Sequence, residues 1–190
     1  LGAIDNKYRH AITLMSCLHF TAAKPYTERV RQMAGKDAKV YSVGALALDN
    51  VKTIKPHSIR DFKRIYGIDL SIPTVLVTFH PETVSFDRNR LFVRELIAAM
   101  ERMDDQIIIT MPGADTTGNL VRAMLGKFIE SSNRRVFGIE SFGTTGYFSC
   151  MKHCRFLLGN SSSGIIEAAS FGKYVINTGD RQKGRMAGRN

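Results

Sequence analysis

Apolar, β-rich segments alternate with helix-like segments through most of this chain, and this alternation restricts the fold more than any other feature. The run 74–79 (TVLVTF) is rich in apolar and β-branched residues, as a strand covered on both faces should be. Strand–helix–strand repeats build parallel sheets with right-handed crossover connections. The sequence therefore predicts an α/β fold, a parallel sheet with flanking helices. We expect strands at about 39–44, 73–79, 106–111, 135–139, 155–159 and 174–178, and helices at about 88–103, 116–131, 144–153 and 163–171.

Residues 1–47 differ from the rest of the chain. Two helix-like stretches precede a strand-like segment at 39–44, a pattern typical of the end of an α/β domain. We therefore expect 1–47 to belong to one domain and 48–190 to a second, with a hinge near Gly44–Asn50. The charged stretch from about 51 to 72 looks less regular and would begin the second domain.

Charge and hydropathy narrow the classes of partner. The 190 residues include 27 Lys and Arg against 17 Asp and Glu, a formal net charge of +10. The basic residues are spread along the chain without a basic tail or a nucleic-acid module, so we expect phosphate-bearing small molecules and no nucleic acid as partners. No apolar run approaches the roughly 20 residues of a membrane span, and no membrane association is expected.

The cysteines predict neither disulfides nor a metal site. Cys17, Cys150 and Cys154 are too few for a disulfide framework in a chain of this size. Cys150 and Cys154 flank His153, but a metal site needs more ligands at better spacing. We expect reduced thiols in a cytoplasmic protein with no metal. The start at Leu1, without Met or a signal-peptide pattern, predicts that the chain is part of a longer protein.

Polar loops follow four of the predicted strands, at the edge of a parallel sheet where ligands gather. The segment after 155–158 is Gly159-Asn160-Ser161-Ser162-Ser163-Gly164, and it opens a helix-like stretch. Small residues let backbone amides approach a ligand, and a helix start favours an anion. One serine can cap the helix, but three exceed what a cap needs. Ser161, Ser162 and Ser163 are therefore predicted to bind phosphate.

Glu167 and Arg181 extend this prediction. Glu167 lies four residues after Ser163 and would share its helix face, where a carboxylate suits two ribose hydroxyls. A capping box is excluded because Gly164 stands where Ser or Thr is needed, and a solvated glutamate is the alternative. Arg181 follows the 174–178 strand, and its guanidinium matches phosphate oxygens, although a solvated loop is the alternative.

Three further residues are candidates for catalysis. His80 ends a buried strand before a proline, where it would donate to a leaving phosphate or transfer protons. A lone histidine is more often structural. Asp5 and His10 span the start of a helix and mean little by spacing alone, since Asp5 has the pattern of an N-cap. Glu82 has the pattern of an exposed residue and receives no role.

Four segments make the sequence similar to the hydrolysing UDP-N-acetylglucosamine 2-epimerases, which feed sialic acid synthesis. The segments lie in the family's order and together cover nearly the whole chain. They are IDNKYRHAIT at 4–13, TFHPET at 78–83, GNSSSGIIE at 159–167 and GDRQKGR at 179–185.

The resemblance implies two Rossmann-like domains with the active site between them, the glycosyltransferase-B arrangement. This chain would then hold the end of the first domain, 1–47, and most of the second, 48–190, truncated at its C-terminus. Further catalytic carboxylates would lie upstream of Leu1, so we expect the isolated chain to bind UDP weakly and to be inactive. Relatives are commonly dimers or tetramers, which implies a homo-oligomer.

The implied reaction converts UDP-N-acetylglucosamine and water to UDP and N-acetylmannosamine, without metal or cofactor. A base removes the C2 proton as UDP leaves C1, and water then adds to the glycal. By position, Glu167 would hold the ribose. Ser161 and Ser162 would hold the diphosphate with support from Arg181, and His80 would face the departing phosphate. Asp5 and His10 would be part of the catalytic wall on the first domain.

The sequence departs from the family pattern at Glu82, where a small apolar residue is expected, and at Ala169 and Tyr174, where proline is expected. Glu82 would weaken nucleotide affinity or indicate another sugar. The departure at Glu82 leaves open a hydrolysing epimerase of UDP-2,4-diacetamido sugars. Three further alternatives also stay open: a non-hydrolysing 2-epimerase, a glycosyltransferase of the same architecture, and a non-enzymatic nucleotide-binding module.

Overall fold

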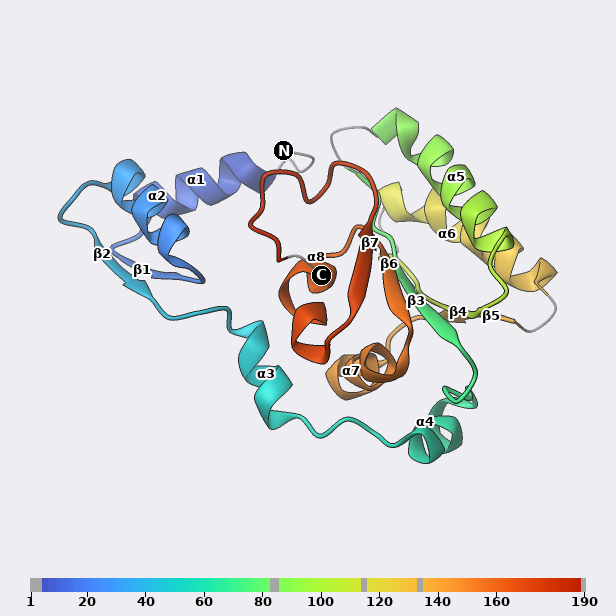
Figure 1. Ribbon diagram of the computed structural model, residues 1–190. Helices are drawn as coiled ribbons and strands as arrows, with labels where there is room; N and C mark the ends of the chain where they lie inside the picture. Colours follow the sequence, from blue (N-terminus) through green and yellow to red (C-terminus); the bar gives the residue numbers. More distant parts are fainter. Residues whose placement is uncertain (1–4, 83–85, 114–115, 133–134, 189–190) are drawn as a thin grey trace.

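The structure is a computed structural model that describes residues 5–82, 86–113, 116–132 and 135–188 (Figure 1). Helices and strands alternate along most of the chain, and the strands form two separate parallel sheets. The elements are α1 (Asp5–Met15), β1 (Leu18–Thr21), α2 (Lys24–Ala34), β2 (Lys39–Ser42), α3 (Ala47–Thr53), α4 (Ile59–Tyr66), β3 (Thr74–Thr78), the 3-10 turn Phe86–Arg88, α5 (Asn89–Glu101), β4 (Gln106–Thr110), α6 (Thr116–Ser131), β5 (Val136–Ile139), α7 (Gly143–His153), β6 (Phe156–Gly159), α8 (Ser162–Ile166), the 3-10 turn Ala168–Phe171 and β7 (Tyr174–Asn177).

The smaller sheet pairs β1 with β2 in parallel and packs against α2. Its interior is small, and two buried hydroxyls, Thr21 Oγ1 and Thr27 Oγ1, lie 2.6 Å apart within it. The aromatic rings of Phe20 and Tyr41 stack on the outer face of this sheet, where both are more than half exposed. The smaller sheet and its helices form the lobe at the left of Figure 1.

The larger sheet has the order β5-β4-β3-β6-β7, with every pair parallel. Its central strand β3 buries Val75, Leu76 and Val77 completely, because helices cover both of its faces. Helices α5 and α6 lie together on one face, and α4 and α7 lie on the other (Figure 1). Alternate side chains of each strand therefore enter two separate apolar clusters.

All five strands of the larger sheet lie where the sequence predicted them, and helices α5, α6 and α7 match their predicted ranges within two residues. The predicted helix at 163–171 is divided, since α8 ends at Ile166 and a 3-10 turn spans Ala168–Phe171. Strand β1 was not predicted, because its four residues are too few to show a period.

The description of 51–72 as less regular was wrong in part, because this stretch holds the last three residues of α3 and all of α4. Ser58 caps α4 by accepting a hydrogen bond from the Asp61 amide at 3.1 Å, and Gly67 ends it with φ of 71°. Phe62 is completely buried on the inner side of α4. The charged side chains of α4 lie on its outer side and hid this amphipathic pattern from the reading of the sequence.

The structure leaves the division at 47/48 and the hinge at Gly44–Asn50 as predictions. Helix α3 starts at Ala47, inside the expected hinge.

Among the described residues, no helix combines the length and apolar character that a membrane span requires. Cys150 and Cys154 are buried, whereas Cys17 is exposed.

The central strand should dominate the stability of the larger sheet. We expect Leu76→Ala to lower the free energy of unfolding by about 2–5 kcal/mol, because it leaves a cavity in a fully buried position. The control Ile176→Ala lies on the edge strand β7, where the side chain is 51% exposed, and should change it by less than about 1 kcal/mol. Urea denaturation measures both, and equal losses would contradict this account of the core.

Candidate functional site

The carboxyl ends of β3, β6 and β7 lie side by side because the strands pair in register. Thr78 pairs with Gly159, and Gly159 pairs with Asn177, so the loops after these residues begin next to one another. These loops carry His80, the three predicted serines and Arg181. The site thus forms at the edge of the sheet where ligands gather in parallel α/β folds.

Ser161 is the N-cap of α8. Its Oγ accepts hydrogen bonds from the Ser163 amide at 3.3 Å and from Ser163 Oγ at 3.0 Å, so the capping alternative holds for this serine. Ser162 is the first residue of α8 and is partly exposed. Because α8 has only five residues, its dipole is smaller than a long helix would supply, and binding of an anion here depends on hydroxyls, amides and nearby cations.

Tyr147 of α7 belongs to the same site and was missed by the sequence analysis. Its hydroxyl lies 2.6 Å from Ser163 Oγ and 3.3 Å from Thr78 Oγ1, and Thr78 Oγ1 lies 2.8 Å from Thr110 Oγ1. Burial raises the pKa of Tyr147, so the phenol stays protonated at neutral pH. The only sequence signal was its place in an apolar helix, where a tyrosine hydroxyl needs a partner.

A cavity of about 500 Å³, here called the serine cavity, lies beside these hydroxyls. It is lined by α3, the ends of β3 and β4, the 140–144 loop, α7, Ser161, Ser163 and Glu167. Ser163 and Glu167 therefore face the same space, in keeping with their spacing of four.

Glu167 brings a partly buried carboxylate to this cavity. Its Oε2 atom is buried and has no hydrogen-bond partner among the described residues. Burial raises the pKa of the carboxyl above its usual range. A carboxylate oxygen in this state has the capacity to accept hydrogen bonds from a ligand that carries hydroxyl groups.

His80 lies at the end of β3 beside Arg181. Burial lowers the pKa of the imidazole, and the positive charge of Arg181 lowers it further, so the ring is neutral at pH 7. The Arg181 Nη1 donates to the backbone oxygen of Asn160 at 3.1 Å. The site therefore combines a neutral hydrogen-bonding ring with a fixed positive charge.

The expectation that Glu82 is exposed was wrong, because only 4% of this residue is accessible. Its Oε1 accepts a hydrogen bond from the Asp180 amide at 3.3 Å, directly before Arg181. Asn89 holds the Glu82 backbone through its side-chain amide, at 2.8 and 2.9 Å. The alternation of polar and apolar residues could not reveal this position, since Glu82 is buried by a loop that comes about a hundred residues later.

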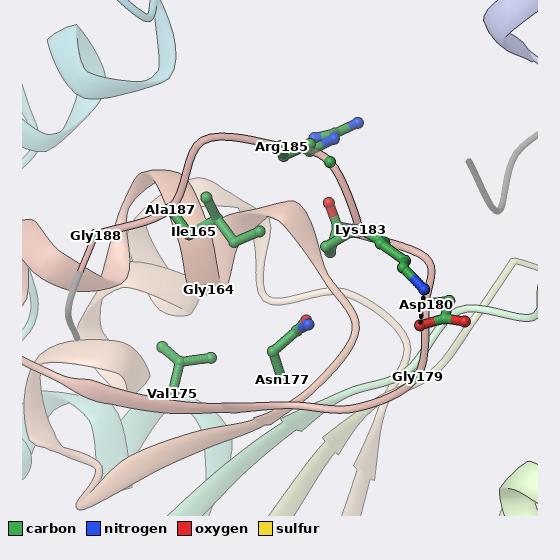
Figure 2. Close-up of a pocket in the computed structure, with 12 residues that line it drawn as sticks. Gly164, Ile165, Val175, Asn177, Gly179, Asp180, Lys183, Arg185, Ala187 and Gly188 are labelled. Carbon is green, nitrogen blue, oxygen red and sulfur yellow. Dashed lines mark ion pairs between the residues drawn. The ribbon is translucent and has the colours of Figure 1, made fainter.

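The 179–188 loop folds over β7 and α8 and encloses a second cavity of about 360 Å³ (Figure 2). Lys183 reaches toward Asp180, with Nζ 3.8 Å from Oδ1, and both side chains are exposed. Arg185 is also exposed. The solvated loop given as the alternative for Arg181 thus describes Lys183 and Arg185, whereas Arg181 itself is partly buried.

A third cavity, of about 780 Å³, is shared by the two parts of the chain. Asn6 and Arg9 of α1 line it from one side and Arg181 from the other, and Tyr26 Oη accepts a hydrogen bond from the Met186 amide at 3.2 Å. His10 is exposed and is not among the lining residues. The side chain of Asp5 lies outside the described part of the structure. Arg9, four residues after Asp5, was missed by the sequence analysis.

No group of three or more His, Cys, Asp or Glu side chains within the described ranges could hold a metal ion.

The sequence profile of the family described as UDP-N-acetylglucosamine 2-epimerase matches residues 1–190. The chain belongs to this family. It is 31% identical over its whole length to a GDP/UDP-N,N'-diacetylbacillosamine 2-epimerase (hydrolyzing) of Campylobacter jejuni, of which it covers 50%. It is 34% identical over 95% of its length to a UDP-N,N'-diacetylbacillosamine 2-epimerase (hydrolyzing) of Legionella pneumophila, of which it covers 48%. This epimerase-family chain thus spans about half the length of these relatives.

Solved structures show the same fold. A UDP-GlcNAc 2-epimerase from Neisseria meningitidis bound to UDP-GlcNAc matches 92% of the chain and 47% of its own, with a TM-score of 0.67 and 18% identity. The MnaA–UDP structure from S. aureus matches 88% of the chain and 44% of its own, with a TM-score of 0.66 and 20% identity. The predicted α/β fold of a glycosyltransferase-B-like epimerase, present in part, is confirmed.

Glu167 should weaken the folded state at neutral pH. A carboxyl whose pKa is higher in the folded chain binds more protons when folded, so stability is lost as pH rises through that range. We expect Glu167→Gln to raise the unfolding free energy at pH 7 and to lose this advantage toward pH 4. The control Glu130→Gln removes an exposed carboxylate of α6 and should change the free energy of unfolding by less than about 0.5 kcal/mol. Urea denaturation at both pH values measures this, and no gain at pH 7 would contradict it.

Proposed function

We propose that the whole protein carrying this chain is a hydrolysing UDP-N-acetylglucosamine 2-epimerase, and that this chain supplies its UDP-binding side. One observation carries the proposal: Glu167 lines the cavity that Ser161 and Ser163 also line, and its buried Oε2 atom has no hydrogen-bond partner among the described residues. A uridine diphosphate has ribose hydroxyls that donate to a carboxylate, and phosphate oxygens that accept from hydroxyls and amides.

The geometry favours one orientation of the nucleotide. The ribose would bind Glu167, and the uracil would lie toward the 140–144 loop at the far side of the serine cavity. The diphosphate would lie over Ser161, Ser162 and Ser163 and extend toward Arg181. The sugar would then enter the cavity shared with α1, where Asn6 and Arg9 are found.

His80 and Arg181 fit the first chemical step. Departure of UDP from C1 develops negative charge on the diphosphate as a base removes the proton at C2. Arg181 would stabilise this charge, and the neutral His80 would donate a hydrogen bond to the leaving phosphate oxygen. The base and the second step, addition of water to the glycal, would depend on residues of the α1 side, where Asp5 and His10 remain candidates.

A second candidate is a hydrolysing 2-epimerase of a UDP-2,4-diacetamido sugar. It is favoured by the relatives from C. jejuni and L. pneumophila, which are named as diacetylbacillosamine 2-epimerases and reach 31% and 34% identity. The residues proposed to hold UDP serve both candidates equally, because the two substrates differ only in the sugar. A non-hydrolysing 2-epimerase is a third candidate.

The product formed by the whole protein separates these candidates. We expect UDP-N-acetylglucosamine and water to give free UDP and N-acetylmannosamine, followed by NMR. Activity confined to UDP-N,N'-diacetylbacillosamine would establish the second candidate. Release of UDP-N-acetylmannosamine would establish the non-hydrolysing reaction, and a need for an acceptor would establish a glycosyltransferase.

Loss of the Glu167 carboxylate should weaken nucleotide binding. We expect Glu167→Ala to reduce the affinity for UDP by about 1–3 kcal/mol for each ribose hydroxyl left without its acceptor. The affinity for inorganic pyrophosphate, which has no ribose, should stay unchanged. The matched control Glu130→Ala, at an exposed position of α6, should leave both affinities unchanged. Calorimetry measures these values, and equal losses for UDP and pyrophosphate would refute the ribose assignment.

A further inference from the structure

Asn160 is completely buried between the loops that carry His80, the serines and Arg181. Nothing in the sequence marked it beyond its place before the serines. A buried asparagine has one acceptor and two donors on its side chain, and leaving them unpaired is costly. The bonds that Asn160 makes therefore show what it stabilises.

The side chain of Asn160 binds both backbone polar groups of one residue, His80. Asn160 Oδ1 accepts from the His80 amide at 2.7 Å, and Asn160 Nδ2 donates to the His80 carbonyl at 2.8 Å. The Asn160 amide donates to the Thr78 carbonyl at 3.1 Å. The side chain thus continues the ladder between β3 and β6 beyond their last paired residues, and it holds His80 where the strand has already ended.

The backbone carbonyl of Asn160 acts on the opposite loop. It accepts from Arg181 Nη1 at 3.1 Å and from Gln182 Nε2 at 2.7 Å, which uses both lone pairs of the oxygen. Gln182 is 97% buried by this arrangement, with 3% of its surface accessible. One residue therefore contacts His80 through its side chain and Arg181 through its main chain.

We propose that Asn160 is a positioning residue that holds His80 and Arg181 as one unit facing the departing diphosphate. This proposal depends on the proposed function in one respect, because it assumes that His80 and Arg181 face the diphosphate. Stabilisation of developing charge requires donors that are already oriented before the reaction. Asn160 gives two side chains from loops about a hundred residues apart a common anchor.

The unit has an electrostatic consequence. Arg181 is the charged group beside His80, and together with burial it keeps the imidazole neutral. A histidine released from Asn160 would gain solvent and distance from the guanidinium, and both changes raise its pKa. The pKa of His80 therefore reports on the positioning, and it does so without any ligand.

The same loop offers a matched control. Asn89 is 1% accessible, and its side chain clamps Glu82 with the same pair of bonds that Asn160 makes to His80, at 2.8 and 2.9 Å. Asn89→Ala removes a clamp of equal chemistry two residues further along the loop and leaves the bonds of Asn160 to His80 and Arg181 in place. A general loosening of the loop would affect both variants alike.

The test compares Asn160→Ala with Asn89→Ala in the 190-residue chain, by NMR titration of the His80 ring and by titration with UDP. We expect Asn160→Ala to raise the pKa of His80 toward its ordinary value and to weaken UDP binding by about tenfold. Asn89→Ala should leave the pKa unchanged and weaken UDP binding by less than about threefold. No change for Asn160→Ala, or equal changes for both variants, would overturn the proposal.

Two further outcomes stay informative. If the unaltered chain does not bind UDP even at millimolar concentration, the proposed function fails. The pKa of His80 in the Asn160→Ala variant still shows whether Asn160 positions His80. If Asn160→Ala does not fold, Asn160→Asp and Asn89→Asp replace the pair, since each keeps the size and one acceptor, replaces the donor with a second acceptor and adds one negative charge. A larger loss of UDP affinity for Asn160→Asp is then expected, and equal losses would overturn the proposal.

Discussion

The parallel hydrogen-bonded ladder between β3 and β6 is the constraint on which the rest of the site depends. It pairs Thr78 with Gly159 and so brings together loops that are eighty residues apart in the chain. At Gly159 the backbone has φ of 137°, and a Cβ there would collide with the Thr78 carbonyl oxygen. Only glycine allows the two strands to approach this closely and the chain to turn at once into the serine segment.

Burial sets the charge state of the groups along this edge. It lowers the pKa of His80 and raises those of Glu167 and Tyr147, so each group is displaced toward its neutral form. Such displacement is frequent where binding or catalysis takes place, although structural networks produce it too. Here the Tyr147 hydroxyl contacts Ser163 and Thr78, whereas the buried Oε2 of Glu167, a residue that lines the serine cavity, has no partner among the described residues.

Local patterns were sufficient for much of the fold but for less of the site. Strands such as β3 and helices such as α5 could be predicted from their apolar content and from the period of their apolar residues. Helix α4 was overlooked, although the Ser58 cap, the acidic Asp61 and the terminal Gly67 were visible as a helix signature. Glu82 was misjudged, because its burial depends on a loop that meets it only in the folded chain.

The amino-acid sequence by itself determined the alternating α/β order, the strand-end loops and the residue types that suit a nucleotide, because these depend on short-range spacing. Only the tertiary structure decided which loops meet, that Ser161 is a cap, that Tyr147 and Asn160 contact the site residues, and that His10 is not among the residues lining the cavity shared with α1. The physical reason is that strand register and burial arise from contacts between distant segments, and no local pattern encodes the partner of a buried polar group.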